Sequence, residues 1–452
     1  MNLPENFIVR LQKQFGNNCA DLVESFNQSP ATSIRINSNK LNEFIGEKIP
    51  WCQSGYYLNE RPLFTIDPLF HAGCYYVQEA SSMFLEQVFA QLFSKEENLT
   101  VLDLCAAPGG KSTHIASLIN NKSVLVANEV IASRANILKE NIIKQGKGNV
   151  IVTSSDSKYF GELKELFDCI IIDAPCSGEG LFRKDPNAVN EWSLDQAHYC
   201  SIRQQQILKD VIPCLKQNGI LIYSTCTFNP EENELQLKWL KEKHGFSGIE
   251  LKTESNWNVE EWNDENLYGY RFLPSKIKGE GFFLAVLRKN ESNSSSETSS
   301  NNNFISWMPE LCNEKEVSSI KNWVKKIESE NIYRWKENYF LLSNEQLKMM
   351  NELSDRVKII YAGVELASKK HDEFIPSPAL ALYEQINIPA FNNLNLSKEL
   401  ALSFLRKDSL QIQSEDKGWM LTLFNNHPLG WVKSLGNRMN NYFPMEWRIK
   451  NY

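Results

Sequence analysis

The sequence lacks several features that would each assign the protein to a distinct class. No apolar run approaches the ~20 residues that a membrane span needs, and the opening MNLPENFIVRLQ lacks the basic and apolar regions of a signal peptide. Ten cysteines in 452 residues are too few for a disulfide scaffold, none forms the CxxC pair of zinc ribbons, and the six histidines show no metal-ligand spacing. We therefore expect a cytoplasmic protein with reduced thiols, no membrane partner and no bound metal.

Positive charge is also scarce, because 48 Lys and Arg face 55 Asp and Glu, for a net charge of -7. A nucleic-acid partner would therefore need a local positive surface. The chain is long enough for two or three domains, and 42% of its residues are hydrophobic. Residues 290–303 read NESNSSSETSSNNN, without one apolar side chain, which predicts a flexible linker between two folded parts.

Short apolar runs recur between residues 99 and 289, separated by segments such as 131–145 and 203–217 with helical patterning. This alternation predicts an α/β fold, a doubly wound parallel sheet of the Rossmann-like kind with helices on both faces. Residues 31–39 predict a strand in an appended N-terminal module, and the aromatic tail predicts a small β-rich domain. The predicted strands of the central sheet are VLDL (101–104), SVLVANEV (123–130), NVIVTS (149–154), DCIIIDAP (168–175), GILIYSTC (219–226) and GFFLAVLRK (281–289).

A glycine-containing turn follows the first of these strands. It reads CAAPGGKST at 105–113 and lets the backbone approach a ligand closely, and nineteen residues after Gly110 comes Glu129, where an acidic group can bind ribose hydroxyls. Asp156 and Asp173 end the next two strands. Carboxylates at successive strand ends suit a nucleoside-bearing ligand with a positive centre.

The sequence favours two other interpretations of this turn less. A lone glycine-rich turn is often a packing loop, which the periodic carboxylates make less attractive here. GGKST also resembles the end of a phosphate-binding P-loop, but the first glycine of that motif is replaced by Cys105.

Two cysteines follow the ends of the fourth and fifth strands, Cys176 in DAPCSGEG and Cys226 in YSTCTFNPEENE. Two thiols would then face one pocket. A thiolate that adds to C6 of cytosine makes C5 able to attack a sulfonium methyl group. A protonated Asp173 would donate to the ring, Lys111 would act beside Asp173 or the cofactor, and the second thiol would serve as base or assist release.

Together these motifs resemble the Nol/Nop/Sun family of RNA cytosine-5 methyltransferases, which use S-adenosylmethionine. The resemblance implies that Cys226 is the nucleophile and that Cys176 assists release of the enzyme. It also implies the cofactor contacts, which are Cys105, Ala106, Ala107, Pro108, Gly109, Gly110, Lys111, Glu129, Asp156 and Asp173.

Finer features are similar to one branch, the bacterial methyltransferases of small-subunit ribosomal RNA. They include YYVQEASSM at 75–83, GLFRKDPNAV at 180–189 and the PLG, WVK and LGNR segments near the end. We expect a monomer. The resemblance is strong over 70–290 and implies that 16S ribosomal RNA is the substrate, as free RNA or within the 30S particle. It predicts an appended RNA-binding module (1–98), a methyltransferase domain (99–289), the linker (290–303), an intermediate C-terminal α+β domain (304–375) and a PUA-like RNA-binding domain (376–452).

A flipped or single-stranded cytosine needs contacts from the protein. Arg35, Asn37 and Gln78, with the neighbouring Glu79, match family positions that line this region, although all could be ordinary surface or capping residues.

Further phosphate contacts are predicted at Arg183 and Lys184, and at Lys433 and Arg438 in the tail, where basic residues are concentrated. Simple solvation of these charges is the alternative.

Other functions stay open. The fold could belong to an RNA-binding ribosome-assembly factor with little activity, or the substrate could be tRNA or DNA; a DNA enzyme would need only one nucleophilic cysteine.

Overall fold

The computed structural model describes residues 1–290, 307–325 and 331–450. The predicted linker therefore lies, apart from its first residue, outside the described residues. In the described parts, every helix is too short or too polar to cross a membrane.

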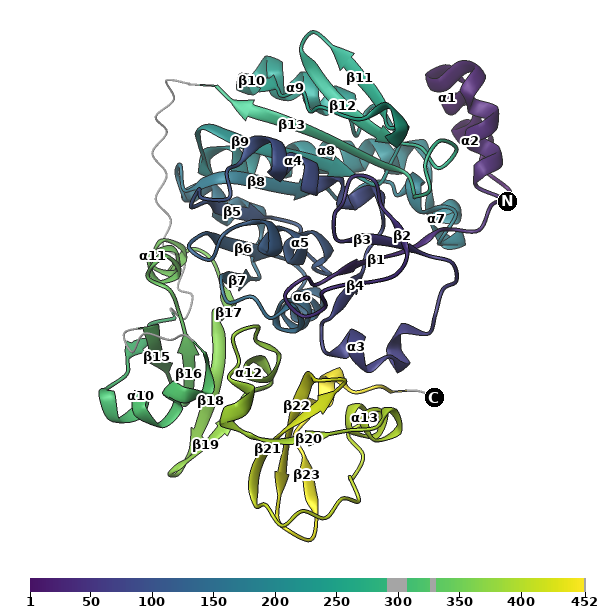
Figure 1. Ribbon diagram of the computed structural model, residues 1–452. Coiled ribbons are helices and arrows are strands. Elements are labelled where there is room, and N and C mark those ends of the chain that lie inside the picture. Colours follow the sequence, from purple (N-terminus) through teal and green to yellow (C-terminus); the bar gives the residue numbers. More distant parts are fainter. Residues whose placement is uncertain (291–306, 326–330, 451–452) are drawn as a thin grey trace.

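One large sheet forms the centre of the molecule (Figure 1). Within the described residues it has ten strands, nine of them in the order β11-β12-β13-β9-β8-β5-β6-β7-β17, with β10 paired to β13. The five strands from β9 to β7 are parallel, and their neighbours β13 and β17 are antiparallel. The strands are β5 (Thr100–Asp103), β6 (Val124–Asn128), β7 (Val150–Thr153), β8 (Phe167–Asp173), β9 (Leu215–Thr225), β10 (Phe246–Gly248), β11 (Glu260–Asp264), β12 (Leu267–Phe272), β13 (Phe282–Lys289) and β17 (Ile359–Ala362).

The order of the parallel strands reverses between β5 and β8. The chain runs outward from β5 through β6 to β7, then returns to the other side of β5 for β8 and β9. Ligands of doubly wound sheets bind at the carboxyl ends of the strands beside such a reversal. The fold therefore places the Gly turn after β5 next to the DAPC segment after β8.

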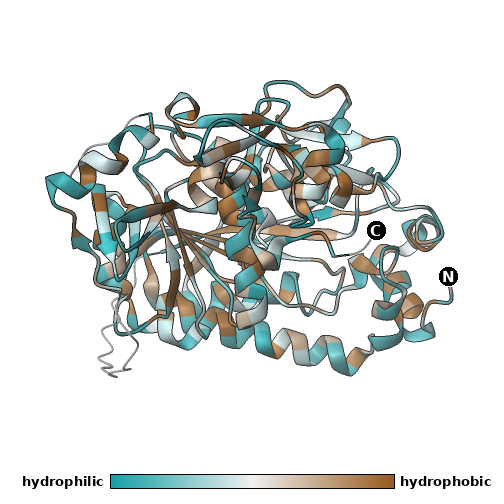
Figure 2. Cartoon of the chain, turned by 90° about the horizontal axis from the view of Figure 1, so that it is seen from below, coloured by the Kyte–Doolittle hydropathy of each residue, from teal (hydrophilic) through white to brown (hydrophobic). Residues whose placement is uncertain are grey.

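Both faces of the sheet are covered, which explains why its strands are apolar throughout. In β8, Cys169 and Ile171 pack into one core cluster and Ile170 and Ile172 into the other. In Figure 2 brown, apolar strands lie inside the molecule, with more teal along the surrounding helices. The first cluster includes side chains of α4 (Leu85–Leu92), α5 (Gly110–Leu118) and α6 (Ala132–Gln145), and the second includes side chains of α8 (Leu194–Val211), α9 (Glu234–His244) and α11 (Asn344–Leu353).

The N-terminal part contributes a helix pair and an antiparallel sheet with the order β2-β3-β1-β4. The predicted strand at 31–39 is confirmed as β1. The helix pair lies beside α7 (Figure 1), and its apolar side chains share a core with the segment 182–192. The elements are α1 (Glu5–Phe15), α2 (Cys19–Ser25), β1 (Thr32–Ile36), β2 (Glu47–Lys48), β3 (Gly55–Leu58), α3 (Pro68–His71), β4 (Tyr75–Val77) and α7 (Pro186–Glu191).

Two smaller sheets follow along the chain, with the orders β14-β15-β16-β18-β19 and β20-β21-β22-β23. Between β16 and β18 of the first of these sheets, the chain forms β17, which joins the central sheet beside β7 (Figure 1). Part of the segment predicted as an intermediate domain is thus built into the central sheet, and the predicted domain boundaries stay predictions. The elements are β14 (Glu310–Leu311), α10 (Glu314–Ile320), β15 (Ile332–Trp335), β16 (Asn338–Leu341), β18 (Val364–Lys370), β19 (Glu373–Pro376), α12 (Pro378–Leu382), β20 (Asn392–Asn395), α13 (Lys398–Leu405), β21 (Gly418–Phe424), β22 (His427–Ser434) and β23 (Met439–Asn441).

Candidate functional site

The glycine turn joins β5 to α5 as predicted. Gly109 has a φ of 113°, a left-handed conformation that glycine adopts without strain, and a Cβ there would lie 3.2 Å from Leu138 Cδ1. The glycine thus allows both the tight turn and the close packing of α5 on α6.

A cavity of about 420 Å³ lies over the carboxyl ends of the parallel strands. It falls in the size range of sites for small molecules, roughly 300–1,000 Å³. The structure brings seven predicted site residues to this main cavity, which are Cys105, Ala107, Glu129, Asp156, Asp173, Cys176 and Cys226.

A smaller cavity of about 210 Å³ shares Cys105, Ala107 and Asp173 with the main cavity. It lies between the N-terminal sheet and the Gly turn, so the two cavities meet at Asp173. Its other predicted site residues are Ala106, Pro108, Gly110, Lys111 and Gln78.

Glu129 and Asp156 occupy the ends of β6 and β7. The Glu129 carboxylate is buried, accepts a hydrogen bond from the Ile131 backbone N–H at 2.9 Å and lies 3.4 Å from Arg134 Nη1. Asp156 is exposed and accepts from the Lys158 backbone N–H at 3.1 Å. The two side chains therefore stand at neighbouring strand ends on the edge of one cavity.

Cys176 and Cys226 lie side by side, with their sulfur atoms 3.0 Å apart. The backbone N–H of Cys226 also donates to the Cys176 sulfur at 3.3 Å. The hydrogen bond with Cys226, followed by burial and the charge of Cys226, raises the pKa of Cys176 well above its usual value. The Cys176 thiol therefore keeps its proton at neutral pH.

Lys111 and Asp173 form an ion pair between the two cavities, with Nζ 2.8 Å from Oδ2. The Ser224 hydroxyl donates to the other oxygen of Asp173 at 2.9 Å. Burial is the largest single effect and lowers the pKa of Lys111, but the charge of Asp173, its hydrogen bond, and the charges of Asp103 and Cys226 together raise it overall. Lys111 is thus a buried cation close to both Asp173 and the cysteine pair.

Gln78 lies in the smaller cavity with its amide oriented by a buried guanidinium. Arg35 Nε donates to Gln78 Oε1 at 2.8 Å, and Arg35 Nη2 donates to Thr113 Oγ1 at 2.7 Å. Asn37 is also buried and donates to the carbonyls of Gly73 and Gln145. Arg35 and Asn37 thus have protein partners that hold the N-terminal sheet against the central fold, and RNA contact by them stays a prediction.

The four other predicted RNA contacts lie in two parts of the chain, 183–184 and 433–438. Arg183 is nearly buried and binds both oxygens of Glu280, and Lys184 Nζ lies 3.8 Å from the same carboxylate. Lys433 pairs with Glu373 at 2.5 Å, and Arg438 is exposed. Their roles in RNA binding stay predictions.

Several residues of the site received no role from the sequence. Ser224 positions Asp173, and Arg203 of α8 lines the main cavity. Buried Glu232 accepts hydrogen bonds from the backbone N–H, at 2.9 Å, and the hydroxyl of Ser177, directly after Cys176. Burial raises the pKa of Glu232 to about 7. In the sequence, only its place in the PEENE segment pointed to a role for Glu232. Contacts between distant chain segments cannot be predicted from a single sequence.

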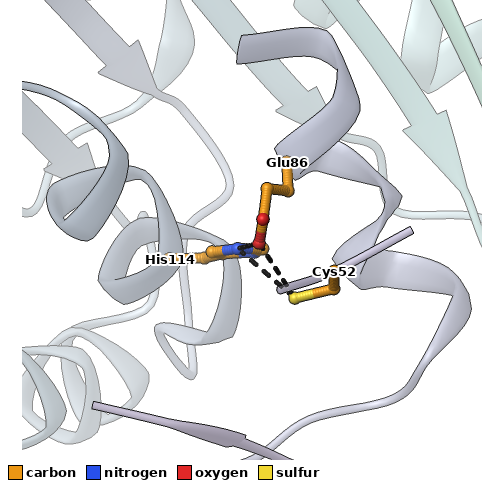
Figure 3. Close-up of side chains that lie close together, drawn as sticks. All are labelled: Cys52, Glu86 and His114. Carbon is orange, nitrogen blue, oxygen red and sulfur yellow. Dashed lines mark hydrogen bonds and ion pairs between the residues drawn. The ribbon is translucent and has the colours of Figure 1, made fainter. Parts of the chain in front are cut away.

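Cys52, Glu86 and His114 form a second buried cluster away from the cysteine pair (Figure 3). The Cys52 thiol donates to Glu86 Oε2 at 3.0 Å, and His114 Nε2 lies 3.2 Å from the same oxygen. Burial raises the pKa of Cys52 to about 12 and lowers that of His114 to about 4, so both are neutral hydrogen-bond donors to Glu86.

The cluster offers three atoms of kinds that can hold a metal ion, but its charge is already balanced. The charge of the buried Arg35 acts on Cys52 and His114, and that of Glu86 acts on Arg35. A bound cation would add positive charge beside this guanidinium. The free-energy cost of removing that cation from water would then not be offset. We therefore treat the cluster as a hydrogen-bonded network that joins the N-terminal part to α4 and α5.

Comparison with known proteins gave matches along most of the chain. A family model described as 16S rRNA methyltransferase RsmB/F matches residues 90–288, the N-terminal domain of 16S rRNA methyltransferase RsmF matches 3–80, and the methyltransferase RsmF PUA domain matches 391–449.

Individual relatives agree with these family matches. Ribosomal RNA small subunit methyltransferase F of Shewanella baltica (strain OS223) is 30% identical over 99% of this chain and 96% of the relative. The protein of the same name from Pectobacterium carotovorum is 36% identical over 64% of this chain and 63% of its own. A crystal structure of a methyltransferase homologue from Pyrococcus horikoshii is 30% identical, with a TM-score of 0.53, over 63% of this chain and 95% of that one.

Proposed function

Because this chain belongs to the RsmB/F family of 16S rRNA methyltransferases, we propose that it methylates carbon 5 of a cytosine in 16S ribosomal RNA through a covalent bond between Cys226 and C6. S-adenosylmethionine is the proposed methyl donor. The single observation that carries the proposal is the pair of sulfur atoms 3.0 Å apart, at a cavity that also holds the glycine turn and the strand-end carboxylates.

The residues of the main cavity fit S-adenosylmethionine. Glu129 would accept hydrogen bonds from the ribose hydroxyls, and Asp156 would face the adenine end. Asp173, with the backbone of the glycine turn, would lie near the methionine part. When bound, this cofactor supplies an electrophilic methyl group on a positively charged sulfur.

The target base is proposed to enter the smaller cavity and to reach past Asp173, where the two cavities meet, toward Cys226 in the main cavity. The smaller cavity lies beside the main cavity, and Tyr76 and Gln78 line it together with Lys111 and Asp173. A base there would have to leave its stack or come from single-stranded RNA. The Gln78 amide, whose oxygen is held by Arg35, would present its NH₂ group to the base.

In the first step the thiolate of Cys226 adds to C6 of the cytosine. The new bond between sulfur and C6 moves the electrons of the C5–C6 double bond toward N3 and O2, and C5 becomes nucleophilic. Cys176, as the neutral thiol, donates its S–H to the sulfur of Cys226 before addition. This hydrogen bond stabilises the attacking thiolate.

The charge that develops on the base needs a donor. Asp173 accepts hydrogen bonds from Lys111 and Ser224 through its two carboxylate oxygens. We therefore assign the donor role to the Lys111 ammonium in place of Asp173, and Lys111 would stabilise negative charge at N3 or O2. Asp173 would accept from the exocyclic amino group, which cytosine has and uracil lacks.

After methyl transfer, the C5 proton must leave and the bond between C6 and sulfur must break. The charge of Cys226 and its hydrogen bond with Cys176 both raise the pKa of Cys176. Once Cys226 is a thioether, it carries no charge and accepts that hydrogen bond less well. Cys176 is then easier to ionise, and it releases its proton to solvent before the stage that needs a base. It takes the C5 proton, the double bond re-forms, and Cys226 leaves as a thiolate.

The proposal is tested with the full-length protein and methyl-labelled S-adenosylmethionine. Naked 16S ribosomal RNA, 30S particles, tRNA and duplex DNA are offered separately, and labelled RNA is mapped by bisulfite sequencing. We expect label in one or more bisulfite-resistant cytosines of 16S ribosomal RNA. Label only in tRNA or DNA, or in a bisulfite-sensitive position, would contradict the substrate or the site of methylation.

A further inference from the structure

A buried carboxylate connects the two cysteine loops. Glu179 lies three residues after Cys176 and is completely buried. It accepts hydrogen bonds from the Trp192 indole N–H at 2.9 Å and from the Phe228 backbone N–H at 3.1 Å. Phe228 lies two residues after Cys226, so one carboxylate joins the segments that carry both thiols.

The N-terminal helix α1 completes this connection. Arg10 Nη2 donates to Glu179 Oε2 at 2.6 Å, and Gln14 Nε2, one turn later, donates to the Phe228 carbonyl at 2.8 Å. Arg10 Nη1 also donates to Gln14 Oε1 at 2.9 Å. Arg10, Gln14, Phe228 and Glu179 thus form a closed ring, which we call the α1 ring.

One backbone hydrogen bond connects the α1 ring with the residue that carries the proposed nucleophile. The backbone N–H of Gly180, next to Glu179, donates to the carbonyl of Cys226 at 2.8 Å. A shift of Glu179 would therefore move both the carbonyl of Cys226 and the loop that carries Cys176. Sulfur atoms that must lie 3.0 Å apart tolerate little displacement.

Aromatic packing holds α1 in place. Phe7 of α1 packs against Phe182 and Trp192, with ring centroids 5.1 and 5.3 Å apart, and Phe26, just after α2, packs against Phe228 at 6.2 Å. These rings belong to one core cluster. The helix pair therefore packs against the segments that follow the two cysteines. The side chains of the α1 ring do not line either cavity.

We propose that Arg10 is a positioning residue for methyl transfer, which acts by holding the Glu179 carboxylate that keeps the Cys176 and Cys226 loops in register. The inference rests on the proposed function and assigns a role in it to the N-terminal helix. Arg10 touches neither base nor cofactor, so its removal lowers the rate of the chemical step and leaves cofactor binding unchanged.

The ion pair of Arg10 and Glu179 also predicts how the activity of an Arg10 variant depends on pH. Burial raises the pKa of Glu179, and the charge of Arg10 opposes that rise. Without Arg10 the pKa of Glu179 rises further, and the protonated group loses an acceptor for the Phe228 N–H. Raising the pH removes this proton, so the activity of an Arg10 variant relative to the unchanged protein increases with pH.

The experiment compares Arg10→Ala and Arg10→Lys with the full-length protein and with Lys13→Ala, which removes an exposed charge from the same helix. Arg10→Ala lowers kcat about 10- to 100-fold, as small misplacements of reacting groups do. Its affinity for S-adenosylmethionine stays the same, and its rate relative to the unchanged protein rises with pH. Arg10→Lys recovers part of the loss, and Lys13→Ala shows none.

A double-mutant cycle identifies the path. In a Glu179→Gln background, which removes the charge that Arg10 balances, Arg10→Ala costs much less than it does alone. If Arg10→Ala does not fold, Gln14→Leu breaks the α1 ring without a change of charge and lowers kcat in the same way. A pH-independent ratio, or an equal loss in the Glu179→Gln background, overturns the proposal.

A second readout needs no RNA. Alkylation with iodoacetamide, mapped by mass spectrometry, proceeds faster at Cys176 and Cys226 in Arg10→Ala than in Lys13→Ala when the loops lose their register. Unchanged alkylation contradicts the positioning role. Absence of methyl transfer by the unchanged protein contradicts the proposed function instead, so the two failures are distinguishable.

Discussion

The cysteine pair and the cluster of Cys52, Glu86 and His114 are two groups of reactive side chains in different settings. Hydrogen bonds between side chains hold both groups in place. The sulfur atoms of Cys176 and Cys226 lie at the main cavity and interact with one another, with the Lys111 cation nearby. Cys52 instead donates a hydrogen bond to the Glu86 carboxylate, whose charge is balanced by Arg35.

The difference teaches that reactive residue types do not define a site by themselves. In the pair, one thiol keeps its proton because of the other, so a change at Cys226 changes the chemistry of Cys176. In the cluster, each donor already has its acceptor, and burial fixes both protonation states. The first arrangement suits a reaction cycle, and the second suits stability.

The largest expected effect separates the two sulfur sites by activity. Cys226→Ala removes the proposed nucleophile and lowers methyl transfer by at least about 10⁴-fold, because C5 is then not activated by addition of the Cys226 thiolate to C6. Binding of S-adenosylmethionine, measured by calorimetry, changes little. Cys52→Ala serves as the control with activity retained. Substantial transfer by Cys226→Ala would remove the distinction between the two sites.

A residue at the edge of the main cavity tests what that cavity is for. Glu129→Ala should weaken S-adenosylmethionine by on the order of 10³-fold, because each hydrogen bond to a charged acceptor contributes about 1.5–3 kcal/mol. Glu129→Gln keeps an acceptor oxygen and should lose less. The measurement is calorimetric titration of the full-length protein, and equal affinities for all three proteins would count against the cofactor assignment.

Acid should reveal the second cluster. The pKa of His114 is lowered from 6.5 to about 4 by burial, so folded His114 stays neutral while the unfolded chain takes up a proton. Stability is complete above pH ~6.5 and falls as the pH drops toward ~4, by up to about 3 kcal/mol for this group. Urea unfolding at several pH values measures the effect.

The matching variants assign the pH effect to a residue. His114→Gln should reduce the pH dependence, and His71→Gln should remove a separate part of it, since burial also lowers the pKa of His71 to about 4. An unchanged pH dependence in His114→Gln would mean that the cluster does not hold a neutral imidazole.

The smallest expected effect is on the stability of the second cluster. Cys52→Ala deletes the thiol donor to Glu86 and should cost about 1–2 kcal/mol of unfolding free energy, the usual range for one buried hydrogen bond with some lost packing. Cys52→Ser keeps a donor and should cost less. A loss of activity larger than the loss of folded protein would show that the cluster takes part in the reaction.

Much of the central fold was predictable from local patterns. The six predicted strands of the sheet correspond to β5, β6, β7, β8, β9 and β13, because strands buried on both faces are apolar throughout. The doubly wound α/β class and the family resemblance are confirmed. The pairing of β17 with β7 was not foreseen, since it joins segments about two hundred residues apart.

The site was predictable only where a motif marked it. The glycine turn, Glu129 and the two cysteines stand in recognisable segments, and the structure brings them to one cavity. The bonds of Arg10 to Glu179 and of Ser224 to Asp173 carry no such mark, because each joins distant segments. The sequence context of Arg35 suggested RNA contact but gave no sign that its side chain is buried among protein partners, and the RNA contact stays a prediction.

The central claim is that Cys226 bonds to the target base and that Cys176 releases it. The most direct measurement incubates Cys176→Ala with S-adenosylmethionine and 16S ribosomal RNA, then separates protein from RNA under denaturing conditions. We expect a complex that survives denaturation and is absent when Cys226→Ala is added to the same chain. No such complex in Cys176→Ala, or an equal amount in the double variant, would contradict the account.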